Sequence, residues 1–385
     1  LGRNTFSGPL PEEYFDLTSL RVLTLGRNAL NDTLSDSISQ LVNLQYLDID
    51  MNMFSGTLPS TIAHLTNMIT MSAMDNLLSG SIPSEIGLMT ELQELLLGDN
   101  QLQGSVPTSL ALLFSSLISL DLEENSLTGP IPSELRHLTS LTLLGLGGNK
   151  LDSSIPAFLA QMSSLRELRL EDNSFTGTIP SVYGTLQKLR ALSLKGNHIN
   201  GTIPTTLGAA TAIISLDLSV NSLSGTIPSS LGNLHFLIIV FMSSNSLTGI
   251  LPQSLYQLSR LVALRLQKNS FNGTISTDIG FMTNMKRLYL SYNHFTGVIP
   301  TNIGNLTDMI GLSVGHNSLG GDIPSSLQHC TGLVNLIGSN NMFRGTLPTF
   351  LGSLVELKHI ELYNNYMSGT IPSELGTLTN LLGLD

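Results

Sequence analysis

Residues 165–188 read LRELRLEDNSFTGTIPSVYGTLQK, and near-copies of this segment fill the chain. Within it, three leucines precede Asn173 in the spacing LxxLxLxxN. Fourteen of the fifteen intervals between equivalent Asn residues are 24 residues, and one, where a residue is inserted near Phe114, is 25. A fixed period of this length indicates a solenoid of stacked repeats. The recurring residues, here named the ladder Asn, are Asn4, Asn28, Asn52, Asn76, Asn100, Asn125, Asn149, Asn173, Asn197, Asn221, Asn245, Asn269, Asn293, Asn317, Asn341 and Asn365.

Each position of the repeat has a physical role. In LxxLxLxx, alternate leucines face inward from a short strand, and stacked coils set these strands parallel at about 4.8 Å. A buried Asn both donates and accepts hydrogen bonds, so its copies form a ladder where the chain leaves the strand. Gly follows the ladder Asn by four residues in fourteen coils, with Asp32 and Ser153 as exceptions. That position is predicted to need a glycine-only conformation or a close backbone approach.

The Gly-x-Ile-Pro segment at residues 177–180 makes the repeat resemble the plant-specific subclass of leucine-rich-repeat proteins, and the resemblance covers the whole chain. It implies an α/β solenoid, a right-handed superhelix of about sixteen 24-residue coils. An inner parallel β-sheet and outer 3-10 or short helical turns are expected. Every Pro is repeat punctuation, so residues 1–385 are expected to form a single array. The array is cut mid-repeat at both ends without paired-Cys caps, so we expect a fragment of a longer protein.

Composition disfavours several classes of partner. The net charge is −11; residues 1–192 hold 9 Lys and Arg against 20 Asp and Glu, and residues 193–385 hold 8 against 8. An acidic surface disfavours the phosphate backbone of nucleic acids, whose affinity comes from Lys and Arg. No apolar run approaches the ~20 residues that span a bilayer, so no membrane contact is expected from this chain itself.

Catalytic and metal-binding motifs are missing from the sequence. The eight His residues share no ligand spacing with one another or with Cys330, which occupies a core position of its coil. No nucleophile elbow, phosphate-binding loop or zinc-protease motif occurs. We therefore predict no enzyme activity within these residues, no cofactor and no metal.

The informative surface is the strand face, whose outward positions the repeat does not dictate. These positions lie four, two and one residues before each ladder Asn. The early coils present acidic residues there, the middle coils are mixed, and the later coils are aromatic and cationic. The predicted ligand-binding residues of this face are Asp48, Asp50, Asp75, Asp99, Asp121, Glu123, Arg169, Glu171, Phe241, Arg265, Lys268, Tyr289, Tyr292 and Tyr363.

Phe241 stands apart from the other phenylalanines. Six of the thirteen occupy a site two residues after the ladder Asn that is predicted to be buried, whereas Phe241 alone holds an outward strand position. Exposed Phe, Tyr and Arg on adjacent strands have the composition of a binding hot spot. Free drift of surface residues, with aromatics well tolerated on strands, is the alternative explanation. The six are Phe6, Phe54, Phe175, Phe271, Phe295 and Phe343.

Two polar features remain. N-x-[ST] sequons predict glycan sites if the protein is secreted; they are Asn31, Asn200, Asn272 and Asn305. A row of Ser or Thr also follows the ladder Asn by five residues, from Thr33 and Thr57 onward. An even hydroxyl row could match an ice lattice, although it is also the consensus of the subclass.

Proteins with similar repeats are ectodomains of receptor-like kinases and receptor-like proteins, and secreted inhibitors of cell-wall polygalacturonases. The resemblance therefore implies an extracellular or cell-surface recognition domain that binds a protein or peptide on the concave sheet face. A co-receptor is a further expected partner, and a transmembrane helix is expected outside this chain. The Arg-x-Arg pair with which some members hold a peptide carboxylate is absent at Arg265. A secreted inhibitor, a structural cell-wall protein, an ice-binding protein and an intracellular scaffold stay open as alternatives.

Overall fold

The computed structural model describes residues 1–385, which form two compact units, Leu1–His198 and Ile199–Asp385. Each unit is a stack of coils that repeat one path: a short inner strand, a turn at the ladder Asn, a second strand and a 3-10 turn. The predicted leucine-rich-repeat solenoid is confirmed, and each unit has eight inner strands. The single array over residues 1–385 stays a prediction.

The inner strands pair in parallel and in register within each unit, one residue of each coil opposite its equivalent in the next. Each three-residue strand buries its central residue and turns the residues on either side outward. In the first unit the strands are β2 (Val22–Thr24), β4 (Tyr46–Asp48), β6 (Thr70–Ser72), β8 (Glu94–Leu96), β10 (Ser119–Asp121), β12 (Leu143–Gly145), β14 (Glu167–Arg169) and β15 (Ala191–Ser193). In the second they are β16 (Ser215–Asp217), β18 (Ile239–Phe241), β20 (Ala263–Arg265), β22 (Arg287–Tyr289), β24 (Gly311–Ser313), β26 (Asn335–Ile337), β28 (His359–Glu361) and β29 (Gly383–Leu384).

A second parallel sheet forms in each unit just after the ladder Asn. Its strands in the first unit are β1 (Ser7–Gly8), β3 (Ala29–Thr33), β5 (Met53–Thr57), β7 (Leu77–Ser81), β9 (Gln101–Gly104), β11 (Ser126–Gly129) and β13 (Lys150–Leu151). Those of the second unit are β17 (Ser224–Gly225), β19 (Ser246–Gly249), β21 (Ser270–Thr274), β23 (His294–Val298), β25 (Ser318–Gly321) and β27 (Met342–Phe343).

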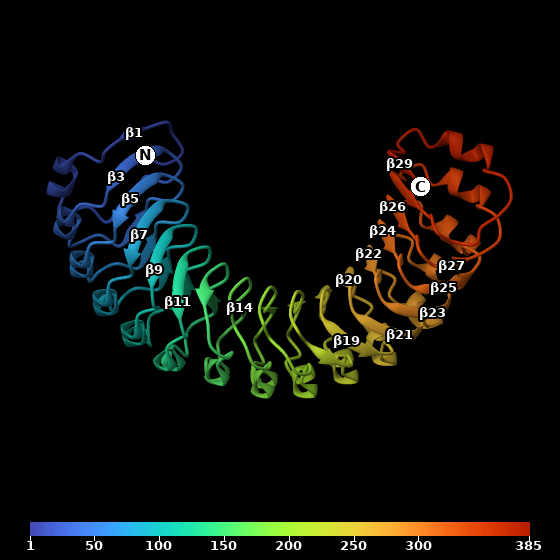
Figure 1. Ribbon diagram of the computed structural model, residues 1–385. Coiled ribbons are helices and arrows are strands. Elements are labelled where there is room, and N and C mark those ends of the chain that lie inside the picture. Colours follow the sequence, from blue (N-terminus) through green and yellow to red (C-terminus); the bar gives the residue numbers. More distant parts are fainter. The chain divides into compact units, whose positions relative to one another are not determined.

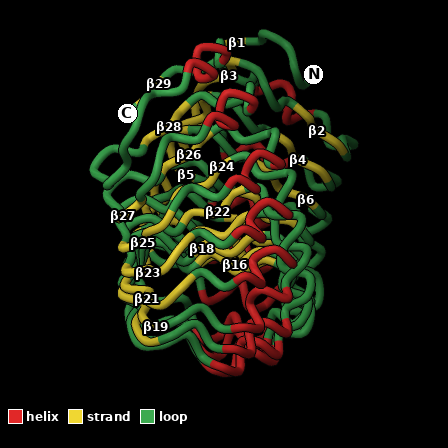
Figure 2. Tube along the Cα trace, turned by 90° about the vertical axis from the view of Figure 1, so that its right-hand side faces the viewer, coloured by secondary structure: helices red, strands yellow, loops and turns green.

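The outer edge of the coils carries short 3-10 turns (Figure 1). Most begin directly after the repeat Pro, whose missing N–H costs nothing at the start of a helix. In the second unit, Figure 2 shows them as a red column opposite the second-sheet strands. They are η1 (Glu12–Asp16), η2 (Asp36–Gln40), η3 (Ser60–His64), η4 (Ser84–Leu88), η5 (Thr108–Leu113), η6 (Ser133–His137), η7 (Ala157–Gln161), η8 (Ser181–Thr185), η9 (Thr205–Ala209), η10 (Ser229–Asn233), η11 (Gln253–Gln257), η12 (Thr277–Phe281), η13 (Thr301–Asn305), η14 (Ser325–His329), η15 (Thr349–Ser353) and η16 (Ser373–Thr377).

The ladder Asn residues link neighbouring coils as predicted. The Oδ1 of Asn76 accepts the backbone N–H of Phe54 at 2.9 Å, and its Nδ2 donates to the carbonyl of Ile49 at 3.0 Å, both in the preceding coil. The same amide also bonds within its own coil, to the carbonyl of Met74 at 3.1 Å. The buried amide is thus fully used, and its loss would leave backbone groups of two coils without partners.

Two positions of each coil have left-handed backbone. The Gly four residues after the ladder Asn has positive φ in all fourteen coils, and Asp32 and Ser153 adopt positive φ in the other two. A Cβ at Gly56 would also lie 2.7 Å from the Thr33 Cγ2, so both predicted reasons for Gly apply there. The residue just before the ladder Asn is left-handed in all sixteen coils, and only Gly148 and Gly196 are glycines.

One core prediction was wrong at a single site. Phe54, Phe175, Phe271, Phe295 and Phe343 are buried, but Phe6 is 47% exposed because no coil covers it in the first repeat. The inserted residue is absorbed on the outer edge, where η5 has six residues instead of five and Phe114 follows it, exposed. The inner sheet therefore keeps its register through this coil.

Candidate functional site

The outward residues of the inner sheet align across the coils because the strands pair in register. Within the second unit, Phe241 faces Arg265 on the next strand, and Arg265 faces Tyr289 on the one after. These three predicted site residues are therefore brought together. Each is half-buried, since its neighbours in the row cover part of its side chain.

The Arg265 guanidinium lies between two aromatic rings. Its Cζ is 4.4 Å from the centre of the Phe241 ring and 5.5 Å from that of Tyr289. No carboxylate lies within ion-pair distance, and Nε is buried without an acceptor. Ring faces attract a cation but do not neutralise it. This row, named the Arg265 row, therefore holds a pre-positioned cation that no anion pairs.

A pocket of about 490 Å³ adjoins this row and is named the tyrosine pocket. Its walls are Tyr289, Tyr363 and the stacked pair of Tyr292 and His316, whose ring centres lie 3.9 Å apart. The other lining residues are Gln267, Lys268, Ser291, Ser313, Gly315, Asn335, Ile337, Ser339 and Glu361. The structure thus gathers the predicted residues Tyr289, Tyr292, Tyr363 and Lys268 around one depression.

Several predicted acidic residues of the first unit serve the fold instead. Asp50 accepts hydrogen bonds from the Ser72 hydroxyl and the Met74 N–H, both at 2.7 Å in the next coil. Asp48 and Asp121 each accept the N–H two residues further on. Their oxygens are partly committed to local bonds, which reduces their value for a ligand. Asp75 and Asp99 occupy the left-handed position before the ladder Asn and are exposed, with no side-chain hydrogen bond.

A cluster of charged side chains lies over a gap in the outward face of the inner sheet of the first unit. Its members are Glu123, Arg169 and Glu171. The intervening coil has Gly145 and Gly147 at its outward positions, and the Glu123 and Glu171 side chains fold over them. Arg169 approaches Glu123 at 3.6 Å and also pairs with Glu167. One oxygen of each of Glu123 and Glu171 is buried without a donor.

The electrostatics of this cluster follow from its burial. Burial first, and then the neighbouring carboxyl of Asp121, raise the pKa of Glu123 to about 7, against the opposing effect of Arg169. Burial also raises the pKa of Asp121. The cluster therefore changes its protonation near neutral pH, which the sequence did not predict.

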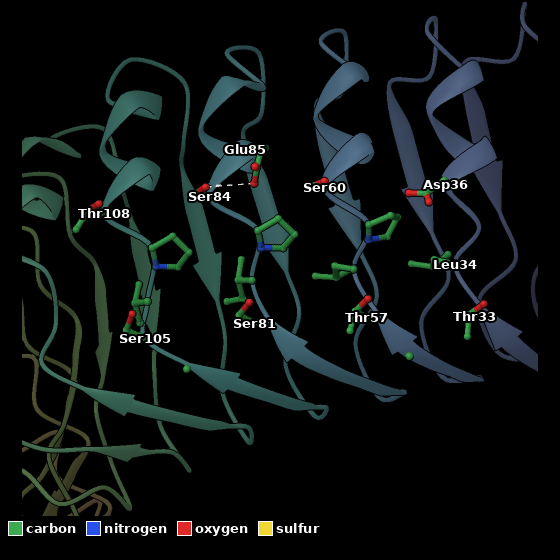
Figure 3. A pocket seen from close by; sticks show the side chains of 18 residues that line it. Thr33, Leu34, Asp36, Thr57, Ser60, Ser81, Ser84, Glu85, Ser105 and Thr108 are labelled. Atoms are coloured by element: carbon green, nitrogen blue, oxygen red, sulfur yellow. Dashed lines mark hydrogen bonds between the residues drawn. The ribbon is translucent and has the colours of Figure 1, made fainter.

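The hydroxyl row of the first unit borders a groove of about 1180 Å³ between the second sheet and the 3-10 turns. Figure 3 shows Thr33, Thr57, Ser81 and Ser105 along one side and Ser60, Ser84 and Thr108 along the other. The Thr33 and Thr57 methyl groups pack towards the Gly of the next coil. An ice plane requires a flat contact surface, and the groove beside this exposed row interrupts such a surface.

The structure also shows the exposure of the four sequon Asn residues and the burial of Cys330. The side chains of Asn31, Asn200, Asn272 and Asn305 are exposed. Cys330 is buried, and burial raises the pKa of its thiol to about 11. The structure contains no group of three His, Cys, Asp or Glu side chains able to hold a metal ion. Its helices are too short to span a membrane.

The sequence missed the floor of the tyrosine pocket. Ser291, Gly315 and Ser339 occupy the outward position two residues before the ladder Asn in three successive coils, between Gln267 and Tyr363. A run of small residues flanked by large ones was the available signal. This run does not by itself predict a depression, because Ser and Gly are common throughout the repeat.

Comparison with known proteins agrees with this architecture. The leucine-rich-repeat family model, "Leucine Rich Repeat", matches residues 43–65, 116–138, 164–186, 188–210, 212–234, 284–306 and 356–378. The crystal structure of the Arabidopsis receptor kinase HAESA, in complex with the peptide hormone IDA and the co-receptor SERK1, is 32% identical. The match covers 98% of this chain and 72% of that one, with a TM-score of 0.72. The chain belongs to the plant-type leucine-rich-repeat family.

Two further solved structures are similar to this chain. A TDR receptor is 32% identical with a TM-score of 0.94, and the match covers 98% of this chain and 66% of that one. The Leptospira interrogans leucine-rich-repeat protein LIC12759 is 28% identical with a TM-score of 0.80, over 98% and 93% of the two chains. A search of the curated proteins found no match. This leucine-rich-repeat chain spans about two thirds of the TDR receptor structure, and it contains no catalytic domain.

Proposed function

We propose that this chain is the extracellular recognition part of a receptor-like protein and binds a peptide or protein segment through the inner-sheet face of the second unit. The observation that carries the proposal is the unpaired guanidinium of Arg265 between Phe241 and Tyr289. Arg and aromatic residues dominate binding hot spots, where they combine apolar contact with directed hydrogen bonds. HAESA, a relative by sequence, was crystallised with a peptide hormone and a co-receptor, which supports the same class of ligand.

The chemistry of the face narrows the ligand further. A guanidinium held by two rings keeps a fixed plane, and its N–H groups suit a carboxylate or another planar anion. Lys268, exposed beside the tyrosine pocket, adds a second positive charge. The segment bound there is therefore expected to present an acidic side chain or a terminal carboxylate to Arg265.

A yeast-displayed random peptide library tests the proposal. The wild-type chain is expected to retain a set of acidic peptides, and the double variant Phe241→Ser/Arg265→Ser is expected to lose them. The matched control is Phe236→Ser/Arg260→Ser, because that pair has the same cation–ring contact, at 5.0 Å, but is exposed outside the inner sheet. Failure of the wild type to retain any peptide, or equal loss in both double variants, would contradict the proposal.

We also propose that the chain is extracellular and carries glycans. The exposure of Asn31, Asn200, Asn272 and Asn305 supports this. Expression in a eukaryotic secretory host, followed by mass spectrometry before and after enzymatic deglycosylation, is expected to find glycans at these sites. An unmodified secreted product would count against it. A co-receptor, as named for HAESA, is a further proposed partner.

A further inference from the structure

We propose that the tyrosine pocket of the second unit receives an aromatic side chain with a hydrogen-bonding group, such as the indole of Trp or the phenol of Tyr. The inference rests on the proposed peptide recognition and names the kind of residue that the pocket selects. It concerns a site separate from the charge on Arg265, because Arg265 does not line the pocket.

The first support is an unused hydroxyl at the bottom of the pocket. Three serines line the pocket. The hydroxyls of Ser291 and Ser313 bond to each other at 2.6 Å. Ser339 is only 2% exposed, lines the pocket, and has no side-chain hydrogen bond within the protein. The Ser339 hydroxyl is therefore available to a ligand, and a group that bonds to it adds one hydrogen bond to the complex.

The second support is the side chain of Gln267. Gln267 lines the pocket, and its Oε1 is buried without a donor. An amide oxygen in that state is completed by an N–H or O–H from outside the protein. The pocket is therefore lined by a hydroxyl at Ser339 and an amide at Gln267, two hydrogen-bonding groups that an aliphatic side chain cannot use.

The third support is the size of the pocket and the aromatic side chains that line it. The rings of Tyr289, Tyr292 and Tyr363 line a depression of about 490 Å³, within the range of pockets that hold small molecules. Aromatic groups prefer other aromatic rings at edge or offset contacts, and a Tyr or Trp buried there still needs a partner for its polar atom. Ring walls with a free hydroxyl at the floor meet both requirements at once.

The small floor residues create the depression. A Cβ added at Gly315 would lie 3.2 Å from the carbonyl and hydroxyl oxygens of Ser339, so a side chain there would crowd the floor. Gln267 and Tyr363 stand at the same outward position in the coils on either side of the three small residues. The pocket is thus built from one outward row of the sheet, with the tyrosines of adjacent rows as walls.

N-acetyl-L-tryptophanamide is a suitable probe because the chain contains no Trp, so indole fluorescence can be excited without a background from the protein. We expect a saturable rise in its fluorescence anisotropy. N-acetyl-L-tyrosinamide should displace it, and N-acetyl-L-leucinamide should not. The variants Ser339→Ala and Gln267→Met should each weaken binding about 2- to 10-fold, the loss of one hydrogen bond.

The control variant is Ser243→Ala. Ser243 holds the same position of its coil as Ser339, two residues before the ladder Asn, but it does not line the pocket. Circular dichroism confirms that each variant is folded. Absence of saturable binding, equal competition by the leucine amide, or wild-type affinity in Ser339→Ala would overturn the inference. If library peptides depend on Arg265 but none needs an aromatic residue, only this inference fails. If the probe binds but no peptide does, the proposed function fails and the pocket stands.

Discussion

The Cζ of Arg265 lies 4.4 Å from the ring centre of Phe241, one strand away in the inner sheet of the second unit. A double-mutant cycle with Phe241→Ala and Arg265→Ala is expected to give a coupling of about 0.5–1 kcal/mol in urea unfolding, typical of a cation on a partly exposed ring. The exposed pair of Arg260 and Phe236, at 5.0 Å, should couple more weakly. Equal coupling in the two pairs would show that the inner-sheet setting adds nothing.

The stability of the first unit should fall as pH rises through the range in which Glu123 titrates. Its pKa is raised from an ordinary 4.5 to about 7 in the fold, chiefly by burial. Between these values the folded chain holds a proton that the unfolded chain has lost, so the stabilisation is complete below pH 4.5 and lost towards pH 7. Glu123→Gln should remove at most about 3 kcal/mol of this dependence.

The measurement is urea unfolding of wild type and Glu123→Gln at about pH 5 and about pH 8, two values that lie on either side of the raised pKa. The variant should be the more stable of the two at pH 8. Asp121 and Asp50, whose pKa values burial also raises, act in the same direction, so a smaller slope will remain. An unchanged slope in the variant would mean that Glu123 ionises normally.

Val220 should be a weak point of the second unit. It is a β-branched residue with φ of 57°, a left-handed conformation that Asn340 and Asn364 occupy in equivalent positions. Left-handed backbone costs about 1–2 kcal/mol for residues with a Cβ, and Asn tolerates it better. Val220→Asn should therefore raise the midpoint of thermal unfolding. Ser244→Val, which places a β-branched residue at the equivalent position of the next coil, should lower it. The same shift from both changes would refute this account.

Loss of one ladder amide should cost about 1–3 kcal/mol. Asn173 is 8% exposed, accepts the Leu151 N–H at 2.9 Å and donates to the Leu146 carbonyl at 2.9 Å. Asn173→Ala removes both bonds and leaves those groups buried. Asn43 donates one bond, to the Thr18 carbonyl, from an exposed position, so Asn43→Ala should cost much less. Denaturant unfolding compares the two directly.

Gly56 and Gly129 separate backbone strain from crowding. Both have φ near 75°, but a Cβ at Gly56 would meet the Thr33 methyl at 2.7 Å, whereas one at Gly129 has open space. Gly129→Ala should cost about 1–2 kcal/mol from strain, and Gly56→Ala about 1–3 kcal/mol more from crowding. Thr33→Ser removes the methyl and should recover the second part only. No recovery would assign the whole cost of Gly56→Ala to backbone strain.

The features that the sequence predicted are those in which one residue type carries one role in every coil. The ladder Asn and the Gly four residues later were predicted correctly because Asn alone fills the first position and Gly is the residue best suited to the left-handed backbone of the second, where only Asp32 and Ser153 replace it. The left-handed residue before the ladder Asn was missed, since Arg27, Asp75 and Val220 share that conformation without sharing chemistry. There the neighbouring coils impose the conformation, and the local sequence does not disclose it.

The candidate site was only partly readable for a related reason. Phe241, Arg265 and Tyr289 sit at outward positions that the period identifies, so their alignment could be predicted. Glu123 and Glu171 fold over the gap left by Gly145 and Gly147. This arrangement depends on side-chain directions across three coils. The pocket floor depends on the absence of bulk at Ser339. Spacing alone reveals neither an unpartnered hydroxyl nor a depression.

The ladder amide of each coil reaches back to the preceding coil and no further, as Asn76 does to the coil of Ile49 and Phe54. Within each unit, successive coils are therefore joined by the same few bonds, whatever their outward residues are. Unequal recombination in multiples of 24 codons would lengthen or shorten such a gene while each junction stayed chemically unchanged. Lineages could then shuffle, duplicate or discard rows of recognition residues without redesigning the scaffold that presents them.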